Sequence, residues 1–211
     1  MAAEICLCSS GLLWDERRLA ARYAFLRRRR GEVRLDLLYY PYRLLEIHGV
    51  AAWRFFGKRP LCLLLAQDAR TGACLRVPSF PALREEKLVF LPGEGRAGFC
   101  PARMEGPGLA GQAPAHVAPP SCSGEEADKE AEAFALAAWG RRCNLPLGPR
   151  ADIRLTGKKA FFLHKPFWIM RPEAEPSDGK IFLFDASTGL GGVSEYWNVA
   201  EYALSLGGTP S

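Results

Sequence analysis

The sequence predicts an α+β fold of two related units, each a helix packed on a small antiparallel hairpin. The first observation is a pentapeptide pattern, D-A-x-T-G, that occurs at residues 68–72 and again at 185–189. The second is a common order of elements before it: helix, strand interrupted by proline, turn and apolar strand. The third is a Pro-, Gly- and Ala-rich segment at 94–122, which predicts a linker or long loop. The expected domains are therefore residues 1–93, 94–122 and 123–211.

The first unit is expected to begin with a helix over residues 15–31, where apolar residues recur at helical spacing. From Val33 onward, apolar and charged residues alternate as they do in a strand, and Pro41 interrupts that strand. The motif GKRP at 57–60 indicates a turn. The apolar run LCLLLA at 61–66 then predicts a buried strand that leads into the first D-A-x-T-G.

The second unit repeats this order after the expected linker. Ser123 and Glu126 form a capping-box pattern at the start of a helix over 123–143. The following strand is interrupted by Pro166, so that HKPFWIMR corresponds to YYPYRLLE in the first unit. A second apolar strand leads into FDASTG, and a short amphipathic helix over 194–207 closes the chain. The shared order predicts an internal repeat.

The two D-A-x-T-G segments have a local physical explanation. Asp68 and Asp185 stand at the end of a strand, where a carboxylate can accept backbone N–H groups of the turn. Gly72 and Gly189 close the motif, and glycine tolerates the left-handed conformation that a bulged hairpin turn needs. These four residues are therefore expected to be structural turn residues and not a catalytic pair of carboxylates.

A helix, a strand with aromatic residues and a hairpin that ends in Asp-x-x-Thr-Gly resemble the PepSY-like and cystatin-like small domains of bacterial proteins. The segments LCLLLAQDARTG and KIFLFDASTG carry this resemblance, which covers about residues 15–77 and 123–193. It implies paired, non-catalytic inhibitory or interaction domains, many of them in secreted or membrane-tethered proteins. The chain departs from that family in its Pro-aromatic elements, PYRLL and PFWIM.

The sequence contains no local motif for catalysis, cofactor binding or metal binding. Its histidines, His48, His116 and His164, lack the spacing of metal ligands, and its seven cysteines include no C-x-x-C pair. We therefore expect no catalytic residue, no cofactor and no metal site built from a local motif. A site assembled from distant Cys, His and Asp residues stays open, and so does an enzyme with dispersed catalytic residues.

The chain is expected to be cytoplasmic. No basic region precedes the short apolar patch near the start, which is therefore not a convincing signal peptide. No apolar run approaches the roughly 18 residues that a membrane span needs. The odd number of cysteines and their place in apolar runs favour a reducing compartment.

The abundant aromatic residues around the prolines predict a protein-interaction or assembly module. Such residues are enriched at the energetic centres of interfaces. The partner would be another protein or further copies of the chain, docked through a sheet edge and an aromatic face. The candidate contact residues are Tyr40, Tyr42, Trp53, Phe55, Phe167 and Trp168.

An alternative function is binding of nucleic acid or another anion through the first helix. Residues 1–93 contain 16 Lys and Arg against 9 Asp and Glu, and Arg27, Arg28, Arg29 and Arg30 are consecutive. Clustered arginines can contact phosphates. Cations are also favoured at the end of a helix by its dipole, so the same run has a purely structural explanation.

Overall fold

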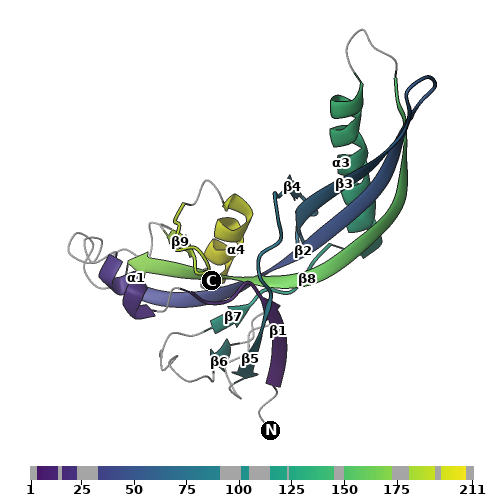
Figure 1. Ribbon diagram of the computed structural model, residues 1–211. Helices are drawn as coiled ribbons and strands as arrows, with labels where there is room; N and C mark the ends of the chain where they lie inside the picture. The colour runs from purple at the N-terminus through teal and green to yellow at the C-terminus, as the bar shows by residue number, and fades with distance from the viewer. Residues whose placement is uncertain are drawn as a thin grey trace. The chain divides into compact units, whose positions relative to one another are not determined.

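The computed structural model describes residues 4–13, 16–22, 33–90, 101–104, 115–122, 124–144, 150–172, 181–192 and 196–207 (Figure 1). These residues contain three helices and nine strands. In chain order they are β1 (Glu4–Ser9), α1 (Glu16–Arg22), β2 (Val33–Trp53), β3 (Gly57–Asp68), β4 (Cys74–Arg76), β5 (Arg84–Phe90), β6 (Pro101–Met104), β7 (Ala115–Val117), α3 (Gly124–Cys143), β8 (Asp152–Pro172), β9 (Phe182–Asp185) and α4 (Trp197–Gly207).

The described strands form one mixed sheet in the order β4-β3-β2-β7-β6-β5-β1-β8-β9, and β2 also pairs with β8. The β2–β7 pair is parallel, whereas the β1–β5, β2–β3 and β8–β9 pairs are antiparallel. The prediction of two separate helix-plus-hairpin units is therefore wrong. Strands that are remote in sequence satisfy one another's backbone groups, and this pairing leaves no trace in local sequence patterns.

The long strands, their prolines and the segment 94–122 explain why the sequence did not predict this sheet. Strands β2 and β8 are each 21 residues long, well beyond the roughly 3–10 residues of an ordinary strand. Each continues through its proline, and the carbonyl oxygens of Pro41 and Pro166 still accept hydrogen bonds from Ala69 and Ala186, at 3.1 and 2.9 Å. The segment 94–122, expected to be a linker, contributes β6 and β7 to the sheet.

The chain divides into two compact units that do not follow the expected boundaries at 93 and 123. Unit 1 comprises Met1–Tyr40, Ala82–Pro119 and His164–Ser211, and unit 2 comprises Pro41–Pro81 and Pro120–Leu163. Each unit therefore combines segments from both halves of the chain. Strands β2 and β8 supply residues to both units.

Helix α3 covers one face of the strands of unit 2 and lies along β2 and β3 (Figure 1). Ala127, Ala131, Ala135 and Trp139 are spaced by four residues, so they form one stripe, and all four are buried. Ala131, Ala135 and Trp139 pack against Leu45, Ile47, Leu63 and Leu65 of β2 and β3. The helix was expected to belong with the second half of the chain, but it packs on strands of the first half.

Polar contacts fix the register of α3 on its sheet. Asp128 pairs with Arg43 of β2 and, at 2.6 Å, with Lys158 of β8. Burial raises the pKa of Asp128, but the hydrogen bonds from Lys158 and Arg43 outweigh it and hold that pKa below its usual value. The side-chain amide of Gln67 donates to the backbone oxygens of Ala127, at 2.6 Å, and Gly72, at 3.2 Å. The helix is thereby tied to the first D-A-x-T-G turn.

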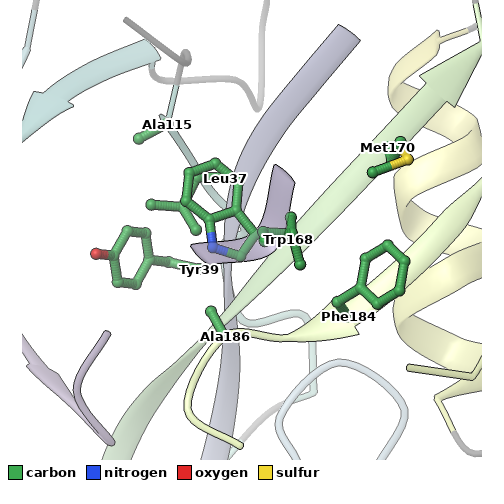
Figure 2. Packing of buried hydrophobic residues seen from close by; sticks show 8 residues of the cluster. Leu37, Tyr39, Ala115, Trp168, Met170, Phe184 and Ala186 are labelled. Carbon is green, nitrogen blue, oxygen red and sulfur yellow. The ribbon is translucent and has the colours of Figure 1, made fainter. Parts of the chain in front are cut away.

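Unit 1 has its own apolar core, in which Trp168 of β8 lies close to Leu37 and Tyr39 of β2 (Figure 2). These side chains are at most 4% exposed. The cluster also contains Leu19, Ala115, Met170, Phe184 and Ala186. Four strands and α1 thus contribute to one core through residues that are far apart in the sequence.

The two D-A-x-T-G turns have matching backbone geometry. Asp68 and Asp185 accept hydrogen bonds from the backbone N–H two residues later, at 2.8 and 2.9 Å. Gly72 and Gly189 have φ angles of 78° and 72° and donate to the backbone oxygens of those aspartates. This is the turn geometry that the sequence predicts. The internal repeat itself stays a prediction.

We expect Gly72→Val to destabilise the protein by about 1–2 kcal/mol, because a β-branched residue is strained in the left-handed region. A side-chain carbon at Gly72 would have only ordinary contacts, the nearest at 3.6 Å from Cys122 Sγ, so the penalty comes from the backbone. Urea unfolding measures this change. Gly157→Val is the control, since Gly157 lies in β8 with open space around it; equal losses from both variants would contradict the explanation.

Candidate functional site

A concave site lies in unit 2, where the β2–β3 hairpin turns. It is a cleft of about 740 Å³. Three cationic and three aromatic side chains are among its lining residues, and no aspartate or glutamate is. The lining consists of Trp53, Phe56, Lys58, Arg59, Pro60, Leu61, Cys62, Trp139, Arg142 and Cys143.

Strand β3 supplies one wall of this cleft. Its pairing with β2 extends to the hairpin turn, where Gly57 has a φ angle of 80°. In the described part of the chain, its registered pairing with β4 begins only at Leu65. In the described residues, the stretch of β3 from Lys58 to Cys62 therefore pairs with β2 on one side and precedes the part of β3 that pairs with β4 on the other. GKRP was expected to be the turn, but these residues begin β3, and the turn consists of Arg54–Phe56.

The last turn of α3 supplies the other wall. Trp139 is only 3% exposed, and it approaches β2 at Gly49. A side-chain carbon at Gly49 would lie 2.6 Å from the Trp139 ring and 2.9 Å from the backbone oxygen of Arg154. Glycine at this position therefore allows the indole to lie against the strand. Arg142 and Cys143 follow on the same helix, so their positions depend on this contact.

The cleft is suited to an anion that carries a planar group. Lys58, Arg59 and Arg142 are exposed and offer positive charge and N–H donors. Trp53 and Phe56 offer ring surfaces on which a base or another flat group can stack. Among the lining residues that the structure describes, no carboxylate competes for the cations.

The aromatic residues predicted to bind a partner do not form one surface. Tyr40, Phe167 and Trp168 are buried in unit 1, at most 4% exposed. Tyr42 and Trp53 are half-buried in unit 2, and only Trp53 lines the cleft. Phe55 is 80% exposed at the hairpin turn, where the guanidinium of Arg54 lies 5.5 Å from its ring centre.

The Arg27, Arg28, Arg29 and Arg30 run lies outside the described residues, so the predicted anion site on the first helix stays a prediction. The cationic residues of the cleft were missed because GKRP predicts only a turn, and the arginines after Trp139 fall within the helix expected over 123–143, to which no binding role was given. One sequence signal could have found them. In both segments, 56–59 and 139–142, Lys or Arg lies within four positions of an aromatic residue.

A second cluster of ionisable groups lies in unit 1 around Asp185, whose side chain is 1% exposed. Lys165 Nζ lies 2.8 Å from Asp185 Oδ2, the Tyr196 hydroxyl donates to the same oxygen at 3.2 Å, and Ser187 Oγ donates to Oδ1 at 2.5 Å. Burial raises the pKa of Asp185, but the charge and hydrogen bond of Lys165 and the hydrogen bonds of Ser187 lower it below its usual value. Burial raises the pKa of Tyr196.

This cluster has a structural explanation. Both Asp185 oxygens are used, and they join the second D-A-x-T-G turn to Lys165 of β8 and to Tyr196, next to the start of α4. Lys165 Nζ also lies 4.9 Å from the Tyr196 ring centre. A buried carboxylate with this many partners is stabilised as an anion, which suits an anchor between elements.

Comparison with protein-family models, with curated proteins and with solved structures gives no match to this chain. The resemblance to PepSY-like and cystatin-like domains therefore stays a prediction. In the described part of the chain, none of the helices is long and apolar enough to span a membrane.

We expect the stability of the protein to fall between neutral pH and pH 5 because of His164. Burial lowers the pKa of His164 from 6.5 to about 4, so the unfolded chain binds a proton in this range and the folded chain does not. Stability is therefore lost as the pH falls, by about 2 kcal/mol from pH 7 to pH 5. Urea unfolding of the wild type and of His164→Gln measures the effect. An equal pH dependence in both proteins would contradict this assignment.

Proposed function

We propose that the protein is a non-enzymatic binding protein that holds an anionic partner, single-stranded nucleic acid, in the cleft of unit 2. The observation that carries the proposal is the lining itself, in which Lys58, Arg59 and Arg142 stand among Trp53, Phe56 and Trp139 with no acidic residue among the described lining residues. Grooves that bind single strands combine positive charge along the backbone with aromatic rings on which bases stack. The net charge of +5 adds a favourable long-range field.

The position of the cleft supports a polymeric partner over a small metabolite. The cleft lies at the turn of a hairpin and is bounded by exposed strand residues from Lys58 to Pro60, so an extended strand can enter and leave it. Base stacking contributes about 1–3 kcal/mol per base and is largely independent of sequence. The proposal therefore implies modest sequence preference and strong dependence on salt.

We expect a fluorescein-labelled oligothymidine to bind with an affinity that falls with salt. Three phosphate contacts contribute about −2 to the slope of log K against log salt concentration for a single strand. Replacing Lys58, Arg59 and Arg142 together by serine should remove this contribution and most of the binding. Fluorescence anisotropy across a salt series measures both.

The matched control removes three exposed cations of unit 2 outside the cleft, Arg76, Lys129 and Arg150. This variant has the same net charge as the cleft variant but should keep most of the affinity. Equal losses of affinity in both variants would show that binding depends only on net charge. That result would overturn the cleft as the binding site. Absence of binding by the wild type at low salt would overturn the function.

A second candidate function is docking of a protein partner, and the hairpin turn favours it. Phe55 and Phe56 are 80% and 75% exposed, next to one another at the end of β2. Exposed aromatic pairs are uncommon on surfaces without partners and are typical of interface anchors. The partner would be another protein or a further copy of the chain.

We expect replacement of Phe55 and Phe56 by serine to abolish association with this partner without lowering the unfolding midpoint, since both rings are already exposed. Affinity purification from the native host, followed by mass determination, measures the association. Leu190→Ser is the control, because Leu190 is 56% exposed in unit 1. A strict monomer that retains no partner would exclude this second function.

We also propose that the protein works in the cytoplasm. Cys8, Cys62, Cys74, Cys122 and Cys143 are all free thiols, and burial raises the pKa of Cys74, which disfavours the reactive thiolate. Free thiols persist in a reducing compartment.

A further inference from the structure

We propose that Glu46, His48 and Cys62 form a binding site for a zinc ion on the strands of unit 2. The three potential ligand atoms lie within 4.8 Å of one another. No spacing in the sequence indicates this site, because Cys62 comes from a different strand. The proposal does not rest on the binding of nucleic acid.

The register of the β2–β3 hairpin brings the three residues together. Glu46 and His48 are two positions apart on β2, so their side chains point to the same face. His48 is paired directly with Cys62 of β3. Directly opposed residues of an antiparallel pair have Cβ atoms about 4.5–5.5 Å apart, which is within reach of one shared ion.

The face that carries these residues is the one turned away from α3. Leu45 and Ile47, the neighbours of Glu46, are buried beneath the helix, whereas the side chains of Glu46 and His48 are 29% and 39% exposed. Cys62 is exposed as well. An ion therefore has access from solvent, while the opposite side of the same strands is held by the packed core of unit 2. This support pre-organises the ligands.

The distances suit tetrahedral coordination. His48 Nε2 and Glu46 Oε1 are 3.1 Å apart. Two ligands at about 2.0–2.2 Å from a tetrahedral zinc ion lie roughly 3.4 Å from one another, so only a small adjustment is needed. The imidazole nitrogen and the carboxylate oxygen are thus already close enough to share one ion after that adjustment.

The donor set favours zinc over calcium or magnesium. Thiolate and imidazole are ligands of zinc and related transition metals, whereas calcium and magnesium take oxygen. One thiolate and one carboxylate also balance the charge of a divalent ion. Three protein ligands leave the fourth tetrahedral position for water or a bound group.

Titration of the metal-free full chain with Co²⁺ alone, a spectroscopic substitute for zinc, tests the site. We expect one equivalent to bind and to produce a thiolate-to-metal charge-transfer band, and Zn²⁺ to displace it. Loss of residues that merely orient ligands weakens metal binding roughly 10–100-fold, so loss of a ligand should weaken it at least about 100-fold. Cys62→Ser should also abolish the charge-transfer band, and His48→Gln should weaken binding with the band retained at high Co²⁺.

Cys143→Ser is the matched control, because Cys143 also lines the cleft but is not part of the three-residue cluster. It should bind Co²⁺ as the wild type does. Retention of the band and the affinity in Cys62→Ser, or no binding by the wild type at micromolar Co²⁺ or Zn²⁺, would overturn the site. His48→Gln separates the two proposals, since His48 does not line the cleft: it should bind oligothymidine normally while its metal affinity falls.

Discussion

The continuity of β2 and β8 through their prolines is the constraint on which both units depend. Each strand passes from one unit to the other at or near its proline, between Tyr40 and Pro41 in β2 and between Leu163 and His164 in β8, so neither unit is a continuous stretch of chain. A proline in a strand removes one N–H donor but keeps its carbonyl acceptor. Pro41 and Pro166 use that acceptor to bind the alanine of a D-A-x-T-G turn, which holds the returning strand beside them.

The two turns share a backbone but differ in their surroundings. Around the first, Gln67 and Arg43 connect the turn to α3 through polar contacts, one of them to the buried carbonyl of Ala127. Around the second, Phe184 takes the position before the aspartate and packs in the apolar core, and Lys165 supplies the charge partner of Asp185. The two turns thus have the same backbone geometry although different residues pack around them. This is expected, because the aspartate and the glycine of the motif form the turn through local hydrogen bonds and backbone conformation.

In the part of the chain that the structure describes, the sites proposed to bind a partner or an ion lie in unit 2. The cleft, the two exposed phenylalanines and the three potential metal ligands all lie on the β2–β3 hairpin or the helix that covers it. A hairpin whose inner face is held by a packed helix is a rigid support for residues on its outer face and at its turn. Unit 1 instead buries its polar cluster around Asp185, which suits stability more than recognition.

Local features of this protein were determined by the sequence itself: the two turns, the helix at 124–143 and the apolar strand at 61–66, because neighbouring residues create them. The pairing of strands was decided only in the tertiary structure. Backbone groups pair regardless of side-chain identity, so the parallel contact of β2 with β7 and the length of β2 through Pro41 have no local signal. The same holds for the sites. Arg59 and Arg142 line one cleft, and His48 lies opposite Cys62, only because the hairpin register and the packing of Trp139 against Gly49 bring these residues together.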